Sequence, residues 1–259
     1  MLCKNIVVVT YEKDWEQCQV LLDSIDFRLT GYNVLVIDNT PEPLNLKYSM
    51  TNNMLRVIPW SDLIPNRVMH TPTYDNGWIS QQLLKLQAHQ LFNNEYIVLD
   101  STSVILKSFS DWPSDLYPVL PPTNHRFYQF YKSTSKLFGF INSQKVAPPQ
   151  NPVIFNCDQI KALLNFWPSW REFEEWFCSF KYPSEFWLYD LWLNRQGIPY
   201  HDTNPSSSET TLLQLYNWDS WEEYKQNPRW GYYTVATIKQ QLWEDHRFDK
   251  DNISAINQR

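Results

Sequence analysis

Short apolar runs that alternate with helical patterns constrain the fold of this chain more than any other sequence feature. Each run is β-branched or aliphatic almost throughout, as expected for a strand that is buried on both faces of a sheet. Strands of this kind occur in sheets with helices on both sides. The runs occupy residues 5–10 (NIVVVT), 33–38 (NVLVID) and 96–100 (YIVLD).

Two helical patterns and one further strand separate these runs. Residues 14–25 place four apolar side chains on one helical face, and residues 78–92 carry the clearest helical periodicity of the chain. Residues 54–58 (MLRVI) are expected to form the additional strand. The resulting β-α-β-β-α-β order predicts an α/β fold with a mostly parallel central sheet flanked by helices.

A polar residue ends each of the three buried runs, namely Thr10, Asp38 and Asp100. Ligands of open α/β sheets bind at the carboxyl ends of the strands. Any one of these residues alone is compatible with a turn, because Asp favours turns and caps. Three in equivalent positions favour a ligand site at this edge of the sheet.

The second half of the chain is less regular. Residues 126–131 (RFYQFY) suggest a short strand and residues 158–166 a short helix. Ser184 is a suitable cap for a helix that runs to Arg195 and stops at Gly197. The remaining expectations divide the chain into a main domain and a helical C-terminal extension packed on it. They are a domain over residues 1–214, an extension over residues 215–259, and helices within 219–246 interrupted at Asn227-Pro228.

Composition excludes several classes of protein. The formal net charge is −6 with no basic run, which makes nucleic acid an unlikely partner. The four cysteines have no C-x-x-C spacing, which disfavours a zinc site and suits a reducing compartment. No signal peptide and no membrane-crossing apolar run are recognised, so we expect a cytoplasmic protein without a transmembrane segment. Neither common glycine-loop nucleotide motif occurs.

Four segments in order resemble nucleotide-sugar glycosyltransferases of the GT-A type, and most closely a little-characterised branch of bacterial and viral glycosyltransferase-like proteins. The segment VVVTYEKD (7–14) is similar to the opening strand and base-binding loop, and NGWISQQLLKL (76–86) to a Trp-x-x-Gln-Gln-x-x-Lys-Leu helix. The segment YIVLDSTSVIL (96–106) is similar to the strand that bears the D-x-D motif, and YPSEFWLYDLWL (182–193) to an acceptor-side Ser-Glu-x-x-x-Tyr segment.

The resemblance implies a GT-A-like, Rossmann-like fold and a divalent cation, Mn²⁺ or Mg²⁺, at the acidic motif. Asp100 matches its first acid, but Thr102 stands where the second acid is expected. A neutral hydroxyl is a poorer ligand for a hard dication than a carboxylate. Metal binding is therefore expected to be weak, unless other residues supply ligands or charge. His201 and Asp202 are candidate ligands, and Lys85 and Arg126 are candidate cations in place of the ion.

The resemblance also assigns a donor-binding set, for which ordinary structural roles remain open. Asp14 also suits a helix N-cap, and Gln81 and Lys85 also suit a solvated helix face. Trp78 suits either contact with a sugar or packing at the helix start. The donor-binding set is Thr10, Tyr11, Asp14, Asp38, Trp78, Gln81, Gln82, Lys85, Asp100, Ser101 and Thr102.

On the acceptor side the resemblance points to Glu185 as the general base, with Asp190 behind it. The alternative for Glu185 is an interaction with the helix dipole in the first turn after Ser184. The function expected from these residues is transfer of a sugar from a nucleotide-diphosphate sugar to a glycan or other hydroxyl acceptor. The alternative function is a catalytically impaired protein of the same fold that binds a nucleotide sugar or a glycan.

Overall fold

A five-stranded sheet forms the centre of the computed structural model, which describes residues 3–40, 48–64, 76–105, 128–139, 153–198, 212–215 and 235–238. Its strand order is β3-β2-β1-β4-β6. The first four strands are parallel, and β6 pairs antiparallel with β4. The mostly parallel sheet predicted from the sequence is thus confirmed. The strands are β1 (Asn5–Thr10), β2 (Asn33–Asp38), β3 (Met54–Pro59), β4 (Glu95–Asp100) and β6 (Val153–Asn156).

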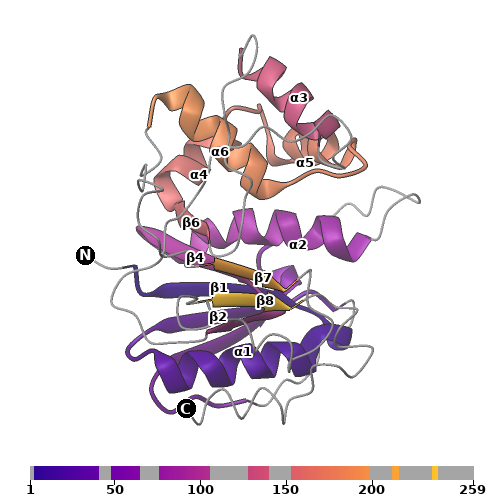
Figure 1. The fold of residues 1–259 in the computed structure, drawn as a ribbon. Coiled ribbons are helices and arrows are strands. Elements are labelled where there is room, and N and C mark those ends of the chain that lie inside the picture. The colour runs from indigo at the N-terminus through magenta and orange to yellow at the C-terminus, as the bar shows by residue number, and fades with distance from the viewer. Residues whose placement is uncertain are drawn as a thin grey trace.

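Helices cover both faces of the sheet (Figure 1). Helix α1 (Trp15–Arg28) lies on one face and α2 (Asn76–Gln87) on the other. Alternate residues of each strand pack against the helices on opposite faces of the sheet. Val7 of β1 belongs to the hydrophobic cluster that contains α2 residues, and Ile6 to the cluster that contains α1 residues. This period of two explains why the strands are apolar at nearly every position.

Four more helices stack beyond α2, and their aromatic side chains extend the core on that side (Figure 1). Phe130, for example, meets Phe177 edge to face with 5.6 Å between ring centroids. Much of the high aromatic content is therefore packing material. The helices are α3 (Tyr128–Leu137), α4 (Cys157–Leu164), α5 (Trp170–Cys178) and α6 (Glu185–Gln196).

The predicted ends of α6 are confirmed. The Ser184 hydroxyl caps the helix by accepting from the backbone N–H of Trp187, and Gly197 ends it in the left-handed region at φ 66°. Asp14 occupies the N-cap position of α1, but its side chain makes no capping hydrogen bond there. The long helical pattern from residue 78 continues beyond α2 as the 3₁₀ helix η3 (Ala88–Leu91). Two further 3₁₀ turns are η1 (Glu12–Asp14) and η2 (Trp60–Asp62).

Two predictions about the second half are wrong. Residues 126–131 were expected to form a strand, but the described part of that segment begins α3. Of the helical segment expected over 219–246, only β8 (Val235–Ile238) is described, and it is a strand. The other residues of that segment, and the loop at 203–211, lie outside the described residues.

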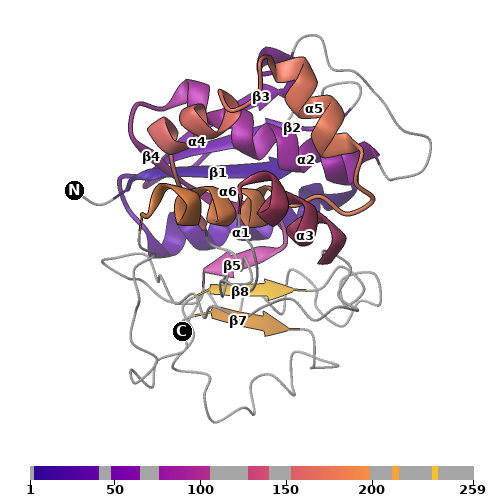
Figure 2. The same ribbon diagram turned by 90° about the horizontal axis from the view of Figure 1, so that it is seen from above.

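A second, three-stranded sheet was not foreseen (Figure 2). Its order is β5-β8-β7, with β5 (Ser103–Ile105) antiparallel to β8 and β7 (Leu212–Leu215) parallel to it. The predicted division after residue 214 falls inside β7. Strand β5 continues directly from β4 after a two-residue turn, so Asp100 stands where the chain leaves the central sheet for this smaller one.

Within the ranges that the structure describes, no helix is both long and apolar enough to cross a membrane.

Candidate functional site

The carboxyl ends of β1, β2 and β4 lie side by side at one edge of the sheet. Thr10 is opposite Asp38 in the β1–β2 register, and Val9 is opposite Asp100 in the β1–β4 register. The chain proceeds from β1 to β2 on one side, while β4 lies on the other, so the strand order reverses between β1 and β4. Such a switch point is where doubly wound sheets bind ligands.

The three side chains at these strand ends do not all point the same way. Asp100 follows Tyr96 and Val98 at intervals of two and so belongs to the α2 face, whereas Thr10 and Asp38 continue the rows that pack against α1. The prediction that the strands deliver polar residues to one edge is confirmed. The pleat then divides those residues between the two faces.

A buried cation joins two carboxylates on the α2 face. The Lys85 ammonium lies 2.8 Å from Asp100 Oδ1 and 3.0 Å from Glu185 Oε1. The side chains of Lys85 and Glu185 are 3% and 0% exposed, whereas that of Asp100 is 35% exposed. We call these three residues the ionic cluster. They come from α2, β4 and α6, which meet at the switch point.

Gln82 and Phe186 complete the surroundings of this cluster. Gln82 lies one helical turn before Lys85, and its side-chain oxygen accepts from the backbone N–H of Glu185 at 3.4 Å. The Lys85 ammonium also lies 4.9 Å from the centroid of the Phe186 ring, within range of a cation–π interaction. Tyr96 donates from its hydroxyl to the Lys85 carbonyl at 2.8 Å, which ties α2 to β4.

Burial and charge act in opposite directions within the ionic cluster. Burial alone would lower the pKa of Lys85, but the neighbouring Asp100 and Glu185 carboxylates outweigh it, so the pKa of Lys85 is raised. Burial raises the pKa of Glu185, and Lys85 only partly offsets this rise. The cluster is therefore a coupled unit in which the lysine is firmly protonated.

Asp100 is the part of the cluster that reaches solvent. A turn at Ser101 and Thr102 follows it, with Ser101 buried and Thr102 half-buried. Next to them, Ser103 begins β5 with a fully buried side chain. Within the cluster, Asp100 is therefore the member that a ligand approaching from solvent can contact.

The end of β2 is held by a network that the sequence analysis did not foresee. Asp38 accepts from the backbone N–H and the hydroxyl of Thr40, which is the turn role left open for it. Asn39 faces α2: it donates to the Gly77 carbonyl at 3.0 Å and accepts from Ser80 Oγ at 2.6 Å. An Asn one residue past a strand end was the only sequence signal for this contact.

The remaining candidates near β1 and α2 lie outside the ionic cluster. Thr10 is fully buried beside the Cys18 thiol, whose pKa burial raises to about 12. Asp14 is buried at the end of η1, and Tyr11 before it is half-buried. Trp78 packs against the core on the α2 side, and Gln81 is half-buried with no described hydrogen bond to the cluster.

Asp190 is likewise separated from Glu185. Five residues further along α6 correspond to a rotation of about 140°, which places it on another side of the helix. It is 2% exposed. Burial raises the pKa of the Tyr131 phenol in α3, and the negative charge of the nearby Asp190 raises it further.

The described residues do not make a metal site by themselves. Among them no three His, Cys, Asp or Glu side chains gather as ligands. Asp100 has an ammonium 2.8 Å away, and its neighbour two residues on is Thr102. His201, Asp202 and Arg126 lie outside the described residues, so their predicted roles stay predictions.

Comparison with solved structures identifies the fold as that of GT-A glycosyltransferases. The galactosyltransferase LgtC, solved with donor and acceptor sugar analogues, superposes with a TM-score of 0.52 at 11% identity, covering 98% of this chain and 95% of that one. The bifunctional glycosyltransferase WbbM gives a TM-score of 0.56 at 14% identity, covering 99% of this chain and 50% of that one. No curated protein sequence matches. Over residues 2–255 the chain matches the family described as "Family of unknown function (DUF6492)", and it therefore belongs to that family.

Proposed function

We propose that this protein is a glycosyltransferase that transfers a sugar from a nucleotide-diphosphate donor to a hydroxyl acceptor. The observation that carries the proposal is the ionic cluster of Lys85, Asp100 and Glu185 at the switch point of the sheet. The GT-A fold supports it, because solved proteins with that fold include a galactosyltransferase held with donor and acceptor analogues.

In this proposal Asp100 contacts the donor directly. Its carboxylate is one-third exposed and accepts hydrogen bonds from hydroxyl groups of the ribose or sugar. Lys85 holds that carboxylate in position through its ion pair with Asp100, and Glu185, whose backbone N–H donates to Gln82, holds Lys85. Preorganised groups of this kind stabilise a transition state because they need not reorient during the reaction.

Glu185 has two roles to be distinguished. As general base it has to meet the acceptor hydroxyl, yet its side chain is fully buried and its carboxylate contacts Lys85. We therefore propose that Glu185 positions Lys85. The expected signature in Glu185→Gln is a loss of stability together with activity, whereas a general base loses about 10²–10⁴ in rate with an unchanged melting temperature. Asp190→Asn provides the same test for the second candidate.

We further propose that the nucleotide lies over the ends of β1 and β2. In this proposal the half-buried Tyr11 stacks on the base, and Asp14 or Asp38 accepts hydrogen bonds from the base or the ribose. Trp78, Gln81, Ser101 and Thr102 would then line the path of the sugar. A divalent ion is expected to bind weakly, because Asp100 is followed two residues later by Thr102 and not by a second carboxylate.

The test is a screen of nucleotide sugars by thermal shift, with and without Mn²⁺, followed by turnover measurements with each donor that binds. A bound ligand raises the melting temperature by mass action, so a shift with one nucleotide identifies the donor class. Donor-dependent sugar transfer supports the enzyme. Absence of a shift with every nucleotide sugar and every free nucleotide diphosphate contradicts the proposal.

Thr102 in the second acid position favours one alternative, a protein that binds a nucleotide sugar or glycan without turnover. The same screen separates the two functions. A binding protein gives the thermal shift and no transfer or donor hydrolysis at any Mn²⁺ concentration, whereas the enzyme gives both.

A further inference from the structure

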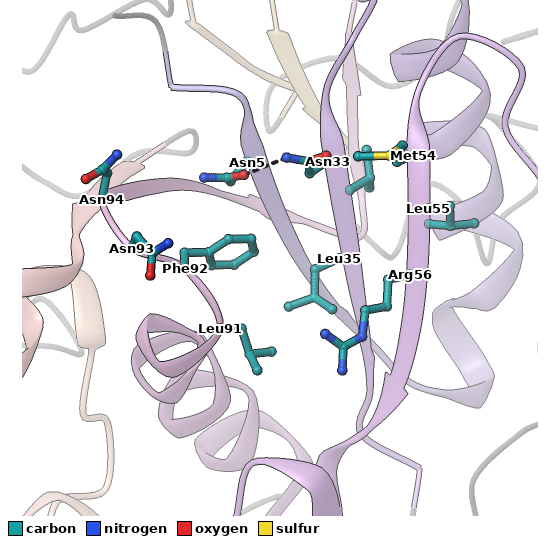
Figure 3. Close-up of a pocket in the computed structure, with 11 residues that line it drawn as sticks. Asn5, Asn33, Leu35, Met54, Leu55, Arg56, Leu91, Phe92, Asn93 and Asn94 are labelled. Atoms are coloured by element: carbon teal, nitrogen blue, oxygen red, sulfur yellow. Dashed lines mark hydrogen bonds between the residues drawn. The ribbon is translucent and has the colours of Figure 1, made fainter.

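A cavity of about 590 Å³ lies at the opposite edge of the sheet from the ionic cluster (Figure 3). It is lined at the amino ends of β1 and β2, along β3, and by the segment between η3 and β4. Strand β1 carries Asn5 at the cavity and Thr10 at the other end, and five residue steps of about 3.3 Å separate them by roughly 16 Å. The cavity is thus distinct from the proposed donor site.

The cavity exists because α2 and η3 cover only part of this face. Leu35 of β2 is paired in register with Arg56 of β3, so the two side chains share the face on which α2 packs. Leu91 and Phe92 close the cavity from the side of η3. Figure 3 shows the Arg56 guanidinium directed from β3 across toward Leu35 and Leu91.

The lining combines an apolar wall with hydrogen-bonding groups and one cation. Leu35, Leu91 and Phe92 supply apolar surface. Asn33 donates to Asn5 Oδ1 at 3.1 Å, which holds these two side chains together at the amino ends of β1 and β2. Small-molecule sites typically have this mixture and a volume of about 300–1,000 Å³.

Charge decides the class of ligand. Among the described residues that line the cavity, Arg56 is the only charged one, and no carboxylate side chain accompanies it there. Within the described part of the chain Arg56 makes no ion pair, and its side chain is exposed. A planar guanidinium beside an apolar wall matches an anionic headgroup attached to an apolar body, because it binds planar oxyanions through two hydrogen bonds.

We propose that this cavity is a second ligand site, which binds a small organic anion with an aromatic or aliphatic body. The guanidinium of Arg56 pairs with the anionic group, and Leu91 and Phe92 contact the body. This proposal does not depend on the proposed transferase activity.

The experiment is a titration of the ¹⁵N-labelled protein with benzoate, followed by backbone and side-chain amide shifts. Benzamide serves as the neutral probe of the same shape, and phenyl phosphate as a second anion. We expect saturable shifts at Asn33, Leu55 and Asn93, and weaker binding of benzamide than of either anion. Whether the natural headgroup is a carboxylate or a phosphate follows from the ratio of the two anion affinities.

Two variants test the role of charge. Arg56→Gln is expected to weaken benzoate binding by about tenfold or more, the factor that a lost charge-assisted hydrogen bond represents. Asn93→Asp keeps the shape of an exposed side chain and places a repelling carboxylate in the lining, so it should weaken benzoate and leave benzamide unchanged. The matched control is Arg171→Gln, which removes an exposed arginine of α5 far from the lining and should not alter binding.

Three results would overturn the proposal. One is the absence of saturable shifts with either anion. Another is binding that both Arg56→Gln and Asn93→Asp leave unchanged. The third is a set of shifts confined to the carboxyl edge, at Thr10, Asp38 and Asp100, which would assign the anion to the other site.

Discussion

Replacing Lys85 by Met tests whether the ionic cluster is the electrostatic unit that its geometry indicates. Met keeps the length and the apolar stem of the side chain and removes the ammonium. Asp100 is 35% exposed and can be solvated, but Glu185 is fully buried and loses its cation. Breaking a buried pair in this way costs about 3–5 kcal/mol of unfolding free energy.

That cost corresponds to a fall in melting temperature of about 6–20 °C, at roughly 2–4 °C per kcal/mol for a chain somewhat shorter than this one. The origin of the cost can be isolated, because Glu185→Gln removes the stranded charge. The double variant Lys85→Met/Glu185→Gln should therefore be more stable than Lys85→Met alone by at least about 1 kcal/mol, a coupling within the range found for contacting residues.

Urea unfolding of the wild type, both single variants and the double variant gives all four corners of this cycle. The matched control is Lys161→Met, an exposed lysine of α4, which should change stability by no more than about 0.5 kcal/mol. If the double variant is no more stable than Lys85→Met, the buried Glu185 charge is not what Lys85 compensates, and the electrostatic account is refuted.

Acidity supplies an independent check on the same variant. Without Lys85 the folded-state pKa of Glu185 rises further above its ordinary value, so the folded protein binds a proton that the unfolded chain releases. The stability of Lys85→Met therefore falls as the pH rises above the ordinary Glu value of about 4.3 and recovers on acidification toward it. A stability loss in Lys85→Met that stays constant from about pH 4.5 to about pH 7 contradicts this reasoning.

Three further outcomes are expected. Asp100→Asn should abolish donor-dependent turnover and leave the circular dichroism spectrum unchanged, because the side chain is partly exposed and keeps its shape; full activity of this variant contradicts a donor contact. Thr102→Asp should tighten Mn²⁺ binding in calorimetry, whereas Thr102→Asn, which has the same shape without the charge, should not; tight Mn²⁺ binding by the wild type would refute the expected weak site. In alkali, the stability from Lys85 is fully present below its ordinary pKa of about 10.4 and is lost as the pH rises through its raised folded-state pKa. If the melting temperatures of the wild type and of Lys85→Met fall in parallel over this pH range, Lys85 is not the source of the alkaline loss of stability.

Local signals located the strands and the ends of helix α6. The runs that end at Thr10, Asp38 and Asp100 were readable because a doubly covered strand needs an apolar side chain at every position. Ser184 and Gly197 were readable because capping depends on a few neighbouring residues. These features need no knowledge of the rest of the chain.

Aromatic composition misled the prediction where the window was too short. Residues 126–131 look like a strand, because aromatic residues favour strands over six positions. Over a longer window Phe130, Thr134 and Phe138 recur every four residues and are buried, and Phe130 packs α3 against Phe177 of α5. Tertiary packing on one helical face thus overrides the local preference.

Contacts between distant segments were beyond local reasoning. Lys85 and Glu185 are a hundred residues apart, and nothing near either residue indicates that they form an ion pair. The second sheet has the same cause, since β5 pairs with β8 from the far end of the chain. The resemblance to GT-A proteins selected both residues of the ion pair, but only the fold shows that they share one buried site.

The exposure of the three cluster members separates two tasks within the proposed transferase. A leaving nucleotide diphosphate has to have its growing negative charge neutralised. Lys85 is 3% exposed and already contacts Asp100 and Glu185, so its ammonium does not reach a phosphate in this arrangement. The cluster instead presents the Asp100 carboxylate, which attracts hydroxyl groups and repels phosphate. We therefore propose hydroxyl recognition as the role of Asp100 and support of that carboxylate as the role of Lys85. Neutralisation of the diphosphate must come from other groups, for which Arg126 and a weakly bound dication are the predictions to test.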